Sequence, residues 1–175
     1  LEDRMVDLVE EGFDVALRIS KMQDSSLIAR KILDTRLMVC AAPKLIEAYG
    51  IPESPEVLRG LPCIVDTNMS GQANWRFVVD DATVSVHVDG SVRVNSPMGT
   101  LNAARHGLGF AFLPSFLADR PIARGELIPV LDAFLPDRPA LQAVYPHRRH
   151  LSGKVRALID FLVDWFDNNP LGDET

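Results

Sequence analysis

The sequence predicts an α/β fold, in which sheets are covered by helices, and three observations support this class. Segments that alternate apolar and polar residues take turns along the chain with segments whose apolar residues recur every three to four positions. The 175 residues are 47% hydrophobic and 24% charged, a composition typical of a globular domain with its own core. No repeat or low-complexity stretch interrupts the pattern.

The first third of the chain begins with a helix pattern and continues with strands. Apolar residues recur at helical spacing as far as Gly12, a residue suited to the left-handed position that ends a helix; they are Leu1, Met5, Leu8 and Val9. Period-two and apolar runs predict strands at residues 13–19, 27–33 and 37–42. Prolines at the start and glycines at the end predict short helices at residues 43–49 and 54–60.

The middle third is richer in strands, predicted at residues 63–65, 75–79, 83–88 and 91–94. The turn pairs Asp80-Asp81 and Asp89-Gly90 separate the last three strands, which predicts an antiparallel meander. Asn95-Ser96-Pro97 then has the order of a helix start, and this helix ends at Gly107.

The last third contains predicted strands at residues 110–113, 127–131 and 141–145, with a short helix that Ser115 caps. Ser152 precedes the final helix, which ends before Pro170. One apolar stripe runs along this helix: Val155, Leu158, Ile159, Leu162 and Phe166. We expect Leu158 to lie in the core, so that Leu158→Asp prevents soluble folding.

Charge and cysteine content restrict the function classes. The net charge of −6 argues against a grip on a nucleic-acid backbone, so any DNA contact lies outside these residues. No run approaches the roughly 20 apolar residues that cross a bilayer. Cys40 and Cys63 lie in apolar segments, which predicts buried free thiols in a reducing cytoplasm.

Several short segments resemble metal-binding or dinucleotide-binding motifs but lack a residue or a context that the motif requires. Residues 66–71 resemble the first half of a calcium loop, but Phe77 stands where a bidentate glutamate is needed. The glycines of residues 107–109 follow a helix pattern, whereas a dinucleotide fingerprint follows a strand. His147 and His150 have no third metal ligand nearby. No catalytic set is visible, so we expect no cofactor, no metal and no enzymatic activity.

The helix start at Asn95, Ser96 and Pro97 is the one positive local signal, because it follows a strand directly. Amide groups and the positive end of the helix dipole make such a place an anion pocket where it faces a cleft. The alternative is an ordinary capped helix.

Eight segments, in order, resemble the effector-binding domain of LysR-type transcriptional regulators. They are VDLVEEGFDVALRIS (residues 6–20), SSLIARKI (25–32), LMVCAAPKLIEAYGIPESPEVL (37–58), Trp75-x-Phe77, VRVNSP (92–97), AARHGLGFAFLP (103–114), GELIPVL (125–131) and AVYPHRRHLSGKVRALIDFL (143–162). The resemblance implies a fold like that of type 2 periplasmic-binding proteins: two α/β lobes joined by two crossing strands, with a small effector in the cleft.

Mapped onto this chain, the resemblance implies a first lobe of residues 1–36 and 132–175 and a second lobe of residues 37–131. The first lobe is incomplete, because the strand, helix and strand that open it in the family are absent from this chain. The winged helix-turn-helix DNA-binding domain of the family is also absent.

The resemblance also implies an effector site. Its residues are Asn95, Ser96, Pro97, Thr67, Asn68 and Arg18. The first five would line the second-lobe wall of the cleft. Arg18 would either pair with a carboxylate effector or tie its strand to a neighbouring acid.

The function implied is that of an effector-sensing and oligomerisation domain of a cytoplasmic bacterial regulator. The implied partners are a small anionic metabolite such as an organic acid, a second copy in a homodimer or tetramer, and DNA through the missing domain alone. The alternatives are an extracytoplasmic solute-binding protein of the same fold and a small α/β enzyme. A secretion signal upstream would indicate the former, and detectable turnover the latter.

Overall fold

The computed structural model describes residues 7–8, 10–20, 27–69, 71–136, 140–146 and 152–168. Contacts divide the chain into two units, with one boundary between Arg36 and Leu37 and another between Asp137 and Arg138. The first boundary coincides with the expected lobe boundary, and the second lies a few residues after the expected position between residues 131 and 132. The assignment of these units to the two lobes stays a prediction.

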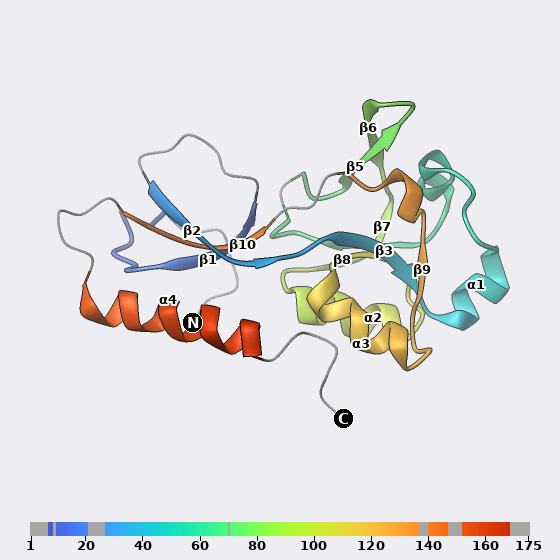
Figure 1. Cartoon of the computed structure of the whole chain (residues 1–175). Helices are drawn as coiled ribbons and strands as arrows, with labels where there is room; N and C mark the ends of the chain where they lie inside the picture. Colours follow the sequence, from blue (N-terminus) through green and yellow to red (C-terminus); the bar gives the residue numbers. More distant parts are fainter. Residues whose placement is uncertain are drawn as a thin grey trace. The chain divides into compact units, whose positions relative to one another are not determined.

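The larger unit is built on a five-stranded sheet in the order β7-β4-β8-β3-β9. Figure 1 labels its strands β3, β7, β8 and β9. The strands are β3 (Leu37–Ala41), β4 (Cys63–Asp66), β7 (Gly90–Val94), β8 (Phe110–Pro114) and β9 (Ile128–Val130). β4 is parallel to β7 and β8, whereas β3 is antiparallel to β8 and β9. A 3₁₀ helix, η2 (Asp132–Phe134), follows β9.

Both faces of this sheet are covered. On one face, buried residues of α2 (Pro97–Arg105) and α3 (Ser115–Ala123) form a core with Met38, Cys40 and Ile64. On the other, α1 (Pro43–Tyr49), the 3₁₀ helix η1 (Pro55–Gly60) and strands β5 (Asn74–Val79) and β6 (Ala82–His87) pack over Cys63 and Val65. The larger unit is therefore a sheet between two apolar layers, as the predicted α/β class requires.

Cys40 and Cys63 lie on opposite faces of this sheet, because they belong to different apolar clusters. Both are free and buried, as predicted. Burial raises the pKa of each thiol to about 12, and the nearby carboxylates of Asp132 and Asp89 add to the rise for Cys40 and Cys63 respectively. Both thiols are therefore protonated near neutral pH.

The predicted meander is wrong. β5 and β6 form an antiparallel hairpin, and its turn residues Asp80 and Asp81 have positive φ angles of 49° and 63°. β7 then leaves this hairpin and pairs in parallel with β4. The missing side chain of Gly90 permits this pairing, because a Cβ atom there would stand 2.7 Å from Val65 Cγ2.

The smaller unit is a three-stranded antiparallel sheet with α4 (Gly153–Asn168) packed against it. β10 (Ala140–Pro146) lies between β1 (Ala16–Ser20) and β2 (Leu27–Asp34). The helix expected before β1 lies largely outside the described residues. Gly12 has the left-handed conformation predicted for it, with φ +73°.

Leu158 is not in the core of this structure, and the expectation from its apolar stripe is wrong. Its exposed fraction is 43%, whereas Ile159 is fully buried. Successive residues are turned by about 100° on a helix, so the face centred on Val155 and Ile159 leaves Leu158 on a flank. Leu158→Asp is therefore not expected to prevent folding of this chain.

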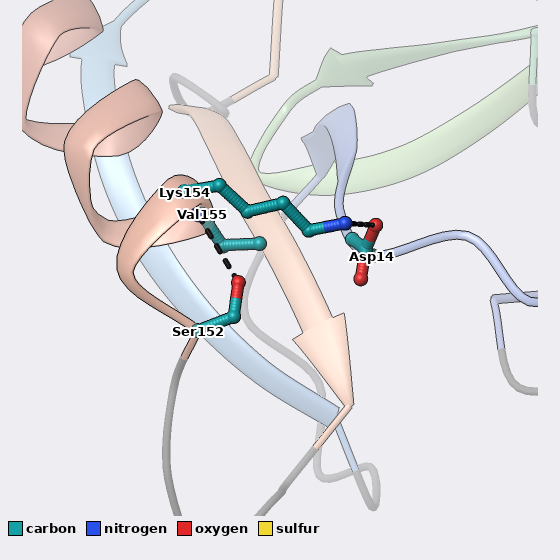
Figure 2. Close-up of polar contacts among 4 residues, drawn as sticks. All are labelled: Asp14, Ser152, Lys154 and Val155. Atoms are coloured by element: carbon teal, nitrogen blue, oxygen red, sulfur yellow. Dashed lines mark hydrogen bonds and ion pairs between the residues drawn. The ribbon is translucent and has the colours of Figure 1, made fainter.

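The start of α4 is capped by Ser152, whose Oγ accepts a hydrogen bond from the Val155 amide at 3.4 Å (Figure 2). Lys154 Nζ, in the first turn, lies 2.6 Å from Asp14 Oδ2.

The cap at Ser115 is a wrong prediction, because Pro114 occupies the N-cap position of α3 and Ser115 is the first helical residue. β8 runs directly into α3 there and leaves no separate capping residue.

We expect Ser152→Ala to lower the free energy of unfolding by about 0.5–1 kcal/mol, because it removes the acceptor for one amide of the first turn. Urea denaturation followed by far-UV circular dichroism would measure the loss. Ser152→Asp is the matched control, since it keeps an acceptor and adds a charge that the helix dipole favours. Equal stability of Ser152→Ala and the parent chain would contradict this role.

Candidate effector-binding site

The larger unit brings two of the predicted site segments together. Asn68 Nδ2 donates a hydrogen bond to the backbone oxygen of Asn95 at 2.5 Å. Thr67 donates twice to the backbone oxygen of Val94, from its amide at 2.7 Å and from Oγ1 at 3.1 Å. β4 and β7 are parallel neighbours, so their following loops leave the sheet at the same edge.

Asp66 fixes the first of these loops, and the sequence prediction did not include it. It ends β4, is only 8% exposed, and its Oδ1 accepts a hydrogen bond from the Asn68 amide at 2.9 Å. This is the geometry of an Asx turn, in which a side chain imitates a backbone turn. The signal in the sequence was the calcium-like pattern that begins at Asp66 and fails at Phe77.

The second segment leads into α2, a helix of nine residues. Ser96 occupies its N-cap position, as predicted, but its side chain makes no capping hydrogen bond. Pro97 is the first helical residue, and the Ser96 backbone oxygen accepts hydrogen bonds from Thr100 N at 2.9 Å and Thr100 Oγ1 at 3.1 Å. The first-turn amides at the positive end of α2 are thus not occupied by the Ser96 hydroxyl.

Arg93 places a cation close to the edge of the sheet where these two loops begin. The sequence did not predict it as a site residue. It lies on β7, and its Nη2 donates a hydrogen bond to Gln72 Oε1 at 3.4 Å. Its side chain is exposed. A basic residue two positions before Asn95 was the available signal, but a strand pattern alone does not show which edge it approaches.

Arg18 does not belong to the same unit as the other five predicted residues. It lies on β1 of the smaller unit, opposite Gln142 of β10 in the antiparallel register. The structure therefore brings Thr67, Asn68 and Asn95 together, with Ser96 and Pro97 following in the chain, and does not relate Arg18 to them.

Within the described ranges, no group of three His, Cys, Asp or Glu side chains is arranged to hold a metal ion. The pair His147 and His150 lies outside those ranges. The described helices also include none with the length and apolar character needed to span a membrane.

Residues 1–167 match the model of the LysR substrate-binding domain. The chain belongs to this family. A LysR substrate-binding domain has the periplasmic-binding-protein-like α/β fold predicted above, so the fold class and the family resemblance are confirmed.

Several relatives of this LysR domain are named as transcriptional regulators. One from Haemophilus influenzae, named as an uncharacterized HTH-type transcriptional regulator, is 38% identical over 156 residues, which are 89% of this chain and 54% of the relative. CrgA from Neisseria meningitidis is 32% identical over 168 residues, which are 95% of this chain and 56% of CrgA. The chain spans about half the length of the curated relatives it matches.

Solved structures agree with this family. The regulatory domain of CrgA has a TM-score of 0.74 and 30% identity, with 89% of this chain and 76% of that chain covered. The regulatory domain of AphB from Vibrio vulnificus has a TM-score of 0.70 and 27% identity, with 91% and 78% covered.

Proposed function

We propose that this chain senses a small anionic metabolite, such as an organic acid, within a LysR-type transcriptional regulator. The observation that supports this most is the pair of hydrogen-bonded loops at Thr67–Asn68 and Asn95, directly before the α2 N-terminus. Backbone and side-chain donors at one sheet edge suit a carboxylate or similar group.

The binding energy available at the α2 N-terminus determines what else the effector site requires. A helix N-terminus stabilises an anion by typically about 0.3–1 kcal/mol at an exposed position. Micromolar affinity needs about 8 kcal/mol. Most of the binding energy must therefore come from further contacts, for which Arg18 and the exposed Arg93 are the proposed cationic candidates.

In this proposal the effector acts by favouring one arrangement of the two lobes over another, since a ligand shifts an equilibrium only through its differential affinity. The chain would also form the homodimer or tetramer of the regulator, and DNA would be contacted by a separate N-terminal domain, in the cytoplasm. Relatives named as transcriptional regulators favour this role over that of an extracytoplasmic solute-binding protein or an enzyme.

A thermal-shift panel of organic acids, neutral sugars and aromatic metabolites tests the proposed ligand class. A ligand at one hundred times its dissociation constant stabilises by about 2.7 kcal/mol, and for this size each kcal/mol raises Tm by about 2–4 °C. We expect a selective rise with an acid. A selective rise with neutral sugars alone would contradict the anionic class.

Ser96→Glu tests the place of binding. A carboxylate at the α2 N-cap repels an anionic ligand, so we expect the acid-induced shift in Tm to disappear while the far-UV spectrum is unchanged. Ser85→Glu is the matched control, because Ser85 is exposed on β6 and lies outside the proposed site. An unchanged shift in Ser96→Glu would place the ligand elsewhere.

A further inference from the structure

Leu131 has an unusual backbone conformation for a buried leucine. Its φ and ψ angles are 59° and 24°, in the left-handed region, and its exposed fraction is 7%. This region is unfavourable for any residue with a Cβ atom, because that atom comes too close to the following carbonyl oxygen. In the described part of the chain, the other non-glycine residues with positive φ are exposed polar residues of turns: Gln72, Asp80 and Asp81.

Apolar packing holds Leu131 in this conformation. Leu131 belongs to the buried cluster that also contains Val39 of β3 and Phe112 of β8. Phe134 of η2, and Leu135 directly after it, are partly buried against the same cluster. The burial of these three apolar side chains therefore offsets the unfavourable backbone conformation at the start of η2.

The backbone of η2 has little other attachment to the larger unit. Two hydrogen bonds run within the segment, from Phe134 N to Leu131 O at 2.9 Å and from Leu135 N to Asp132 O at 3.4 Å. Among the described residues, no backbone hydrogen bond joins residues 132–135 to another element. A segment held by a few side chains, without hydrogen bonds to its neighbours, opens locally at a lower free energy than the strands of a sheet.

η2 lies just before the second connection between the two units. The chain passes from the larger to the smaller unit between Asp137 and Arg138, and β10 begins at Ala140. In the first connection, only Thr35 and Arg36 separate β2 from β3, and Thr35 is 3% exposed. The first connection is too short to change its length, so any such change falls on the second.

We propose that residues 131–136 form a two-state segment of the second connection. In the docked state Leu131 is left-handed and η2 packs on the larger unit. In the released state Leu131 returns to the extended region, Phe134 and Leu135 leave the cluster, and the connection to the smaller unit becomes longer. The part of this segment in an effector response rests on the proposed function, whereas the two states exist without an effector.

Amide protection factors, measured by hydrogen exchange and NMR on the 175-residue chain, test the two states. We expect the amides of Phe134 and Leu135 to be protected at least about tenfold less than those of β3. Leu131→Ala removes buried surface but keeps the unfavourable conformation, so the protection of both amides should fall. Leu131→Gly removes nearly the same surface and tolerates positive φ, so protection should stay about threefold above that of Leu131→Ala.

Ala133→Gly is the matched control, because Ala133 is exposed in η2 and is not among the residues with positive φ. Here glycine should lower the protection of Phe134 and Leu135, since it loses more conformational freedom on docking than alanine does. Protection of these two amides equal to that of β3 would exclude a separate released state. Lower protection in Leu131→Gly than in Leu131→Ala would show that Leu131 is not held against its backbone preference. Either result would overturn the proposal and, because no effector is added, would leave the proposed function to its own test.

Discussion

Trp75→Ala is expected to lower the free energy of unfolding by about 3–5 kcal/mol. The Trp75 side chain is 1% exposed on β5, and its ring centroid lies 5.4 Å from that of Phe112 on β8. Phe77, also on β5, lies 6.1 Å from the same ring. These contacts attach the β5–β6 hairpin to the five-stranded sheet, so the loss would leave a large cavity between them. Urea denaturation measures it.

Two further variants test whether lost aromatic packing causes the destabilisation expected for Trp75→Ala. Trp75→Phe keeps an aromatic ring next to Phe112 and should cost less than Trp75→Ala. Arg76→Ala changes the neighbouring exposed residue of β5 and should stay within about 0.5 kcal/mol of the parent chain. A loss below about 1 kcal/mol for Trp75→Ala would show that the hairpin does not depend on this contact.

Ile159→Asp is expected to prevent α4 from packing on the smaller unit. Ile159 is fully buried in the cluster that joins α4 to Leu141, Ala143 and Tyr145 of β10. A carboxylate there would be buried without a partner, a cost that exceeds what a small sheet with one described covering helix can absorb. Loss of soluble protein, or of cooperative unfolding followed by circular dichroism, would show this outcome.

A conservative substitution at Ile159 should have a smaller effect on stability than Ile159→Asp. Ile159→Val removes one methylene group and should cost about 0.5–1.5 kcal/mol without preventing folding. Ala157→Asp places the same acid on the exposed side of α4 and should leave the chain soluble. A soluble, cooperatively folding Ile159→Asp variant would contradict the orientation of α4 seen here.

Local patterns in the sequence predicted the elements, and long-range pairing decided what they could not show. The helix from Pro43 to Tyr49 and the strand from Leu37 were expected from proline, glycine and apolar spacing that act within a few residues. The parallel pairing of β7 with β4 joins segments on either side of the β5–β6 hairpin. Turn signals at Asp89-Gly90 carry no information about such a partner, so a meander was expected instead.

The same limit applies to the candidate site. Thr67 and Asn68 were expected near Asn95 on the resemblance, and the hydrogen bonds between these loops are present. Asp66 and Arg93 were missed, because the role of each depends on a contact that the strand pairing creates. Leu158 was misplaced for a related reason, since an apolar stripe on a helix does not tell which of its borders reaches the sheet.

The two thiols lie in different layers of the larger unit, so their reactivity can report which part of that unit unfolds first. A protonated, fully buried sulfur does not react with an alkylating reagent until its surroundings open. Cys40 would be released when α2 and α3 separate from the sheet, and Cys63 when α1, η1 or the β5–β6 hairpin does so. The order in which mass spectrometry finds the two labels would show which layer detaches first, with no cysteine introduced into the protein.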